Sequence, residues 1–224
     1  MQGKKMEFVL ARKNMVYCQL KPNKIKDNDV INAFLSVPRE MFVKKNHIKH
    51  AYLDDNLSLG NGRFLLNPVI LSRLIQALEL KKNDTILNIA SGTGYGVVIL
   101  SYLAGTVLGI ENDTSLINKS SELLSKLEIN NAAIIKGDIK EGFIKQAPYD
   151  AIIIEGGVEE VPELILNQLS NNGKLVTIES NESGYGKAIL IEKFENNFIK
   201  NFLFNAYVPL LSAFTSKKKN NFEF

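Results

Sequence analysis

The sequence has few of the residues that mark exported, membrane-spanning or disulfide-bonded proteins. Its single cysteine, Cys18, cannot form a disulfide within the chain, so a reducing cytoplasm is the expected location. The longest apolar stretches, such as residues 97–100 and 151–154, are far too short to span a bilayer. The start of the chain is not followed by the apolar region of a signal peptide. We therefore expect neither export nor insertion into a membrane.

The net charge is small, and histidine is scarce. The 224 residues include 27 basic and 24 acidic side chains, and the net charge of +3 is too small to predict a nucleic-acid-binding surface. The densest basic cluster, residues 217–219, is interpreted as a solvated tail near the C-terminus. His47 and His50 have no third ligand at a recognisable spacing, so no metal site is predicted.

What the sequence does contain is the alternation typical of an α/β protein. Hydrophobic residues make up 45% of the chain, enough for a core, and from residue 81 onward β-rich runs alternate with helical segments. This pattern predicts a doubly wound parallel sheet with helices on its faces. The expected strands are residues 85–89, 106–111, 132–136, 149–155 and 173–179, and the expected helices are residues 96–103, 115–127 and 161–169. Residues 187–193 and 198–206 are expected to complete the sheet as an antiparallel hairpin.

The first 80 residues follow a different pattern. Residues 7–19 and 29–36 are expected to form short helices, and residues 68–78 a longer helix with Pro68 in its first turn. No Gly/Ser-rich linker separates this part from the rest of the chain. We therefore predict an N-terminal helical extension, residues 1–80, packed on an α/β domain formed by residues 81–224.

A glycine-containing turn follows the first expected strand. The sequence ILNIASGTGY, residues 86–95, predicts a strand, a tight turn and a helix, and in a doubly wound sheet such a turn lies at the edge where ligands bind. Gly92 and Gly94 allow a close approach and a positive φ. Free N–H groups at the start of the helix favour an electron-rich group. A tight connection without a ligand would explain the two glycines nearly as well.

Acidic residues follow the next two strands. Glu111 ends the second strand, 17 residues after Gly94, where a carboxylate can accept hydrogen bonds from both ribose hydroxyls of a nucleoside. Asp138 follows the third strand and could accept from an adenine amino group. Alone, each would be explained as an exposed strand-end acid or a turn residue. Because the turn and both acids stand at successive strand ends of one sheet, together they predict a nucleoside cofactor.

The turn favours a cofactor without a pyrophosphate. The residue three positions after Gly94 is Val97, not the third glycine of a dinucleotide site. S-adenosylmethionine is therefore the predicted cofactor, and methyl transfer is favoured over hydride transfer. The candidate cofactor-binding residues are Asn88, Ala90, Ser91, Gly92, Gly94, Glu111, Asn112, Asp138 and Ile139.

Further motifs give the chain a resemblance to a known family. They are residues 15–16 (MV), 19–20 (QL), 37–43 (VPREMFV), 51–54 (AYLD), 57–60 (LSLG), 91–95 (SGTGY), 137–138 (GD), 147–150 (APYD) and 168–169 (QL) with Gly173. From about residue 12 to residue 173 the chain resembles the protein-L-isoaspartate O-methyltransferases. The resemblance implies a class I methyltransferase fold, S-adenosylmethionine as methyl donor, and a methyl ester formed on the misplaced carboxylate of isoaspartyl residues, which begins protein repair.

The chain departs from the family's pattern in the segment that the family uses for its acceptor. After the glycine corresponding to Gly62 the family reads Q-T-I-S-Q-P, and its serine is regarded as the active-site residue. This chain reads R-F-L-L-N-P, with Leu66 at the serine position, so no catalytic residue is predicted. The apolar residues 64–66 favour a less polar acceptor, with Arg63 pairing an anionic group, or they only pack under the next helix.

The first-strand motif differs as well. Asn88 stands where the family usually has an acid, and Ala90 where it has its first glycine. Glu155, at the end of the fourth strand, could orient a substrate or belong to an acidic helix start.

Three functions remain open. Methyl transfer to a carboxylate needs no general base because the acceptor is already ionised, so catalysis depends on holding the reacting groups in line. The acceptor is an isoaspartyl protein or peptide, or a small molecule, and the third alternative is a non-catalytic S-adenosylmethionine-binding protein. No nucleic-acid or membrane partner is expected.

Overall fold

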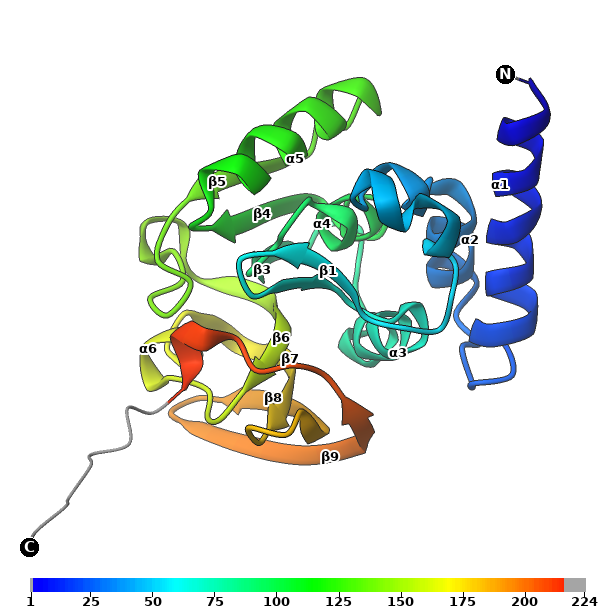
Figure 1. Cartoon of the computed structure of the whole chain (residues 1–224). Helices are drawn as coiled ribbons and strands as arrows, with labels where there is room; N and C mark the ends of the chain where they lie inside the picture. Colours follow the sequence, from blue (N-terminus) through cyan, green and yellow to red (C-terminus); the bar gives the residue numbers. More distant parts are fainter. Residues whose placement is uncertain (1, 216–224) are drawn as a thin grey trace, which may run out of the picture.

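The computed structural model describes residues 2–215, with side chains from residue 6 onward, and the basic cluster at residues 217–219 lies outside the described residues (Figure 1). A seven-stranded mixed sheet has the strand order β5-β4-β3-β6-β7-β8-β9. Its strands are β3 (Thr85–Ile89), β4 (Thr106–Glu111), β5 (Ala132–Lys136), β6 (Tyr149–Val158), β7 (Leu169–Ser180), β8 (Tyr185–Phe194) and β9 (Asn197–Tyr207). Strands β3 to β7 pair in parallel, and β8 and β9 pair antiparallel, so the predicted parallel sheet finished by a hairpin is confirmed.

The helices pack beside this sheet, and most begin where local capping residues predict. They are α1 (Gln2–Asn14), α2 (Asn28–Ser36), α3 (Pro68–Leu78), α4 (Tyr95–Ser101), α5 (Thr114–Lys126) and α6 (Glu163–Leu166), with a π-helical turn (Met15–Leu20) continuing α1. The Asp113 carboxylate accepts from the N–H groups of Ser115 and Leu116 and so caps α5. Asn67 caps α3 in the same way, ahead of Pro68 in the first turn.

One predicted helix is wrong in extent. Residues 161–169 form only the single turn of α6, because Leu169 instead pairs with Tyr149 as the start of β7. The backbone N–H of Tyr149 also donates to the oxygen of Gln168 at 2.8 Å. Strand pairing therefore ends this helix earlier than its apolar pattern suggests.

The core has two parts, one on each face of the sheet. Ile86, Ala151 and Ile153 point to the face covered by α2 to α5, whereas Leu87 and Ile152 point to the face covered by α6 and the segment that follows β9. This alternation is the two-residue period of a strand. Residues of the first 80 positions contribute to the first part, so the N-terminal segment and the sheet share one core.

A short hairpin that the sequence did not reveal lies over the sheet edge. Strand β1 (Leu57–Gly60) pairs antiparallel with β2 (Arg63–Leu65), and Figure 1 shows this hairpin in front of β3 and α4. Its turn is tight, with positive φ at Gly60, Asn61 and Gly62. Leu59 and Leu65 are buried and hold the hairpin on the core.

The N-terminal segment is tied down by polar contacts among the residues of the sequence motifs. Arg12 donates to Tyr52 and pairs with Glu40, and the Tyr52 hydroxyl also donates to Glu40. Thr93 of the glycine turn donates to the backbone oxygen of Phe42 at 2.7 Å. These contacts hold the segment against the glycine turn. Within the described part of the chain, no helix combines the length and apolarity that a membrane crossing requires.

Candidate functional site

Three polar side chains lie on one face of the sheet at its carboxyl edge. Asn88, Glu111 and Glu155 belong to the neighbouring strands β3, β4 and β6, and all three are buried. Asn88 is in register with Gly109 and Ile153, so Glu111 and Glu155 lie two residues further along on either side of it. The strand period thus brings together an amide and two carboxylates.

The glycine turn lies beside Glu111. Gly92 and Gly94 have φ values of +55° and +86°, as the sequence predicts, and Ala90 has a φ of +60° in the same left-handed region. The Ser91 N–H donates to the oxygen of Ile110, which fixes the turn against β4. Leu59 of the hairpin packs so closely on Gly92 that an added Cβ would lie 2.8 Å from its Cδ1. The turn is therefore covered by the β1–β2 hairpin.

Glu111 is surrounded by donors. The N–H of Gly92 donates to its Oε2 at 3.0 Å, and the N–H groups of Asn112 and Asp113 donate to its Oε1 at 2.8 and 3.1 Å. Arg63 adds its Nε–H, 3.1 Å from both carboxylate oxygens. The carboxylate is therefore held in a fixed position.

Arg63 is thus paired within the chain. Its Nη2 also donates to Asn112 Oδ1 at 2.7 Å, and only 5% of its side chain is exposed. The sequence suggests an external anion as the partner of Arg63, and the structure corrects this, since the anion is Glu111. Nothing in the spacing of residues 63 and 111 could have shown this contact.

Glu155 has fewer partners than Glu111. Asn88 Nδ2 donates to Glu155 Oε1 at 2.5 Å, whereas Asn88 Oδ1 has no partner among the described residues. Burial raises the pKa of Glu155 to about 7, opposed by the hydrogen bond from Asn88 and the charge of Arg39. An added Cβ on Gly96 would lie 1.8 Å from the Glu155 carboxylate, so any larger residue at position 96 would displace this carboxylate. Of the two roles suggested for Glu155, the start of an acidic helix is wrong, because the chain continues as β6 to Val158.

Arg39 belongs to the same cluster, which the sequence did not predict as part of the site. Its Nε and Nη2 donate to the backbone oxygens of Ala51 and Leu66, both at 2.7 Å. Its Cζ lies 4.9 Å from the ring centroid of Tyr95. Arg39 Nη1 and the Tyr95 hydroxyl have no hydrogen-bond partner within residues 6–215. The motif VPREMFV was the available signal for Arg39.

The remaining candidates lie further along the same edge. Asn112 is exposed and follows Glu111, and Asp138 is exposed after β5, where its carboxylate accepts from the N–H of Lys140 at 2.8 Å. Ile139 is fully buried. Leu66, which the sequence resemblance predicts to stand at the position of the family's serine, is also fully buried in the core. Among residues 6–215, no group of three His, Cys, Asp or Glu side chains could hold a metal ion.

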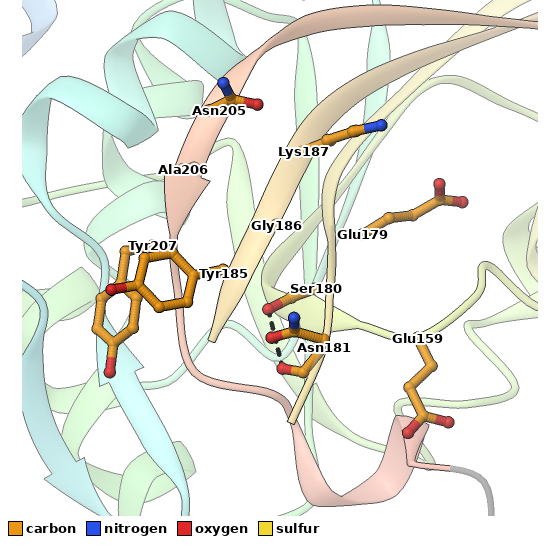
Figure 2. A pocket seen from close by; sticks show the side chains of 10 residues that line it. All are labelled: Glu159, Glu179, Ser180, Asn181, Tyr185, Gly186, Lys187, Asn205, Ala206 and Tyr207. Atoms are coloured by element: carbon orange, nitrogen blue, oxygen red, sulfur yellow. Dashed lines mark hydrogen bonds between the residues drawn. The ribbon is translucent and has the colours of Figure 1, made fainter. Parts of the chain in front are cut away.

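An open groove lies where β6 and β7 end, next to the start of β8 and the end of β9. Its volume is about 740 Å³, and Figure 2 shows Tyr185 and Tyr207 on one side of it, with Glu159 and Glu179 on the other. The two tyrosine rings meet edge to face with centroids 5.4 Å apart, and both are more than half exposed. Since β6 and β7 run parallel to β3, the groove lies at the same sheet edge as the glycine turn.

Comparison with known proteins identifies relatives over nearly the whole chain. The family model for protein-L-isoaspartate(D-aspartate) O-methyltransferase matches residues 11–215. Protein-L-isoaspartate O-methyltransferase 2 of Shewanella sediminis is 35% identical over 191 residues, 85% of this chain and 78% of the relative. The enzyme of Pelotomaculum thermopropionicum is 36% identical over 165 residues, 74% of this chain and 72% of the relative.

Solved structures show the same fold. A Plasmodium falciparum protein assigned to the protein-L-isoaspartate O-methyltransferases, in complex with S-adenosyl-L-homocysteine, superposes with a TM-score of 0.76 at 24% identity. The alignment covers 90% of this chain and 98% of that one. The fold is therefore that of the class I methyltransferases, as predicted.

Proposed function

The chain belongs to the protein-L-isoaspartate(D-aspartate) O-methyltransferase family of S-adenosylmethionine-dependent enzymes, and we propose that it methylates the misplaced carboxylate of isoaspartyl residues in proteins and peptides. The acceptor is then an anion held beside a cationic methyl donor. The observation that carries the proposal is the match over residues 11–215 together with a buried carboxylate, Glu111, beside the glycine turn. Isoaspartyl proteins are the partners that the family implies.

The residues at the sheet edge are chemically suited to S-adenosylmethionine. Glu111 is a fixed anionic acceptor for ribose hydroxyls, and Gly92 and Gly94 leave the turn without side chains. Asp138 is exposed at the end of the next strand, where an adenine amino group could donate to it. We propose the set of nine residues from Asn88 to Ile139 named above as the cofactor-binding residues.

The chemistry of the bound cofactor is the supply of an electrophilic methyl group. This chain contributes the side chains and backbone groups that position the cofactor and the acceptor. The contacts of Glu111 with three backbone N–H groups fix it relative to the turn, and the hairpin residue Leu59 covers Gly92. A fixed and covered site would orient a bound methyl donor and the acceptor oxygen and would limit the access of water, which is the main requirement for methyl transfer to an ionised acceptor.

The acceptor side differs from the family's pattern. Leu66 stands at the position of the family's serine and supplies only its backbone oxygen, which accepts from Arg39. We propose that no hydroxyl at this position takes part in the reaction, so that the acceptor is oriented by other groups. The open groove lined by Tyr185, Tyr207 and Glu159 is the candidate surface for the acceptor, and a protein or peptide acceptor is the one that the family implies.

We propose that residues 1–80 cover the site and that residues 81–224 bind the cofactor. The contact between Thr93 and Phe42, and the hairpin over Gly92, support this division of labour.

The test is methyl transfer from labelled S-adenosylmethionine to an isoaspartyl peptide, with the matched aspartyl peptide as control. Selective labelling of the isoaspartyl peptide is the expected result. Because Leu66 replaces the serine, this result would also show that the serine is dispensable here. Absence of labelling by protein that binds S-adenosylhomocysteine would exclude isoaspartyl methylation and leave another acceptor or a non-catalytic binding protein.

A further inference from the structure

Arg63 is the residue of the site whose contacts the proposed function does not explain. It is the first residue of β2, and its side chain reaches across to Glu111 and Asn112. The Arg63 side chain is 5% exposed, and the Glu111 side chain is 0% exposed. Loss of one partner from an ion pair shielded to this degree costs more than at the surface, because it leaves a buried charge without compensation.

The lone-pair sites of the Glu111 carboxylate are all occupied by hydrogen-bond donors of the chain. A carboxylate has about four lone-pair sites. Gly92, Asn112 and Asp113 donate their N–H groups to these oxygens, and the Arg63 Nε–H is shared between both. Ribose hydroxyls can donate to Glu111 only where one of these donors leaves. The backbone donors are fixed by the two strand ends, so Arg63 is the donor that can be replaced.

We propose that Arg63 and the ribose hydroxyls of the cofactor compete for Glu111, so that residue 63 determines the affinity for the cofactor. The inference rests on the proposed function, in which Glu111 is the ribose acceptor. Because a buried guanidinium without an anion is unfavourable, Arg63 moves out of the pair when ribose binds. This removes one of the contacts that hold the hairpin at the site, while Asn61 still donates to Asp113.

The test is the dissociation constant for S-adenosylhomocysteine measured by calorimetry. Arg63→Gln keeps a polar side chain but removes the charge, and we expect it to bind S-adenosylhomocysteine on the order of tenfold more tightly than the unaltered protein, because the competing charge-assisted contact is lost. Lys174→Gln is the matched control, since it removes a cation from the ion pair with Glu79 at the other end of the sheet. If Arg63→Gln binds S-adenosylhomocysteine equally well or more weakly than the unaltered protein, the proposed competition is refuted.

Glu111→Gln separates this inference from the proposed function. Weaker binding by Glu111→Gln, with no gain in Arg63→Gln, would show that Glu111 binds the cofactor but that Arg63 does not compete. Unchanged binding in both variants would refute the cofactor site as well. Thermal unfolding of each variant shows whether it is folded before its binding is compared.

A measurement on the unaltered protein decides the question if Arg63→Gln does not fold. The Nε–H of Arg63 can be followed by nuclear magnetic resonance and assigned through Arg63→Lys, which lacks it. We expect slow hydrogen exchange of this group while it is bonded to Glu111, and a shifted, rapidly exchanging signal at saturating S-adenosylhomocysteine. A signal that stays unchanged at saturation would overturn the proposal.

Discussion

The two carboxylates at the carboxyl edge of the sheet are in very different surroundings, although they stand on either side of the same strand. Glu111, at the end of β4, accepts from three backbone N–H groups and from Arg63. Glu155, in β6, accepts a side-chain hydrogen bond from Asn88, and burial raises its pKa to about 7. Both side chains are almost fully buried.

The difference follows from where each carboxylate finds its donors. Around Glu111 most donors are backbone groups of the turn and of the strand end, so their positions follow from the fold itself. Around Glu155 the polar atoms are side chains, and those of Asn88, Arg39 and Tyr95 each leave one atom without a partner within the described residues. Unpartnered buried polar atoms are unfavourable. We infer that the surroundings of Glu111, here called the Glu111 side, are rigid. The surroundings of Glu155, the Glu155 side, are the part of the site whose stability changes with pH and with mutation.

Loss of the buried arginines gives the largest expected effect and tests this contrast directly. Arg39→Met removes the donors to the oxygens of Ala51 and Leu66 and the cation near Glu155, and we expect a loss of about 3–5 kcal/mol in the free energy of unfolding, mainly because two buried oxygens lose their donors. Arg63→Met should cost less, about 1–3 kcal/mol, because Glu111 keeps its three backbone donors. Urea unfolding of both variants measures the difference. An equal or larger loss in Arg63→Met would contradict the contrast.

A serine at position 66 tests whether the surroundings of Glu155 can accept another polar group. Leu66 is fully buried, so Leu66→Ser should lower the free energy of unfolding by about 2–4 kcal/mol through the cavity it leaves. Leu74→Ser, at an equally buried position in α3, is the control. Because Leu66 lies beside Arg39, its new hydroxyl can find a polar partner, and we expect its cost to be about 1 kcal/mol smaller. If Leu66→Ser and Leu74→Ser lower the free energy of unfolding equally, the polar groups near Arg39 provide no hydrogen-bond partner for the new hydroxyl.

The pH dependence of stability should be dominated by Glu155. Its carboxyl is protonated more easily in the folded protein than at its ordinary pKa of 4.5, mainly because of burial, with the neighbouring charge of Glu111 acting in the same direction. The folded state therefore binds the extra proton, and stability falls as pH rises from about 4.5 to about 7, by about 2–3 kcal/mol. Asp113, with a pKa lowered to about 2, acts only below this range.

The variant Glu155→Gln isolates this contribution. Its free energy of unfolding should lack the fall between pH 4.5 and 7 that the unaltered protein shows, because glutamine does not titrate. Urea unfolding at a series of pH values compares the two proteins. Parallel profiles would mean that Glu155 keeps an ordinary pKa and that the contrast with Glu111 is wrong.

The sheet was the predictable part of this molecule, since its signals are local. Strand β4 (Thr106–Glu111) and helix α3 (Pro68–Leu78) have the bounds that the sequence predicts, because a buried parallel strand is a short apolar run and Asn67 and Pro68 mark a helix start. The hairpin at residues 57–65 was not predicted, because its strands have only four and three residues. The position of the hairpin also depends on contacts with residues distant in the sequence.

Only those residues of the site that directly follow a strand could be predicted from the sequence. The position of Glu111 at the sheet edge follows from its place after β4, whereas its pairing with Arg63 joins residues 48 apart and has no local signal. Likewise Arg39 stands in a recognisable motif, but its location under Leu66 depends on how the N-terminal segment packs. The roles of the cofactor-binding residues stay predictions that the binding measurements test.

The smallest expected effect concerns the one turn residue that is strained. Ala90 has a φ of +60°, a region where a Cβ costs about 1 kcal/mol or more, and the sequence resemblance predicts glycine at this position. Ala90→Gly removes this cost but adds conformational freedom to the unfolded chain, so we expect a gain in the free energy of unfolding of at most about 1 kcal/mol. Ala104→Gly is the control, because Ala104 is buried and its φ is not positive. This variant should lose stability. A loss in Ala90→Gly as well would show that its methyl group contributes packing to the turn, and that the Glu111 side of the site is held by side chains as much as by backbone.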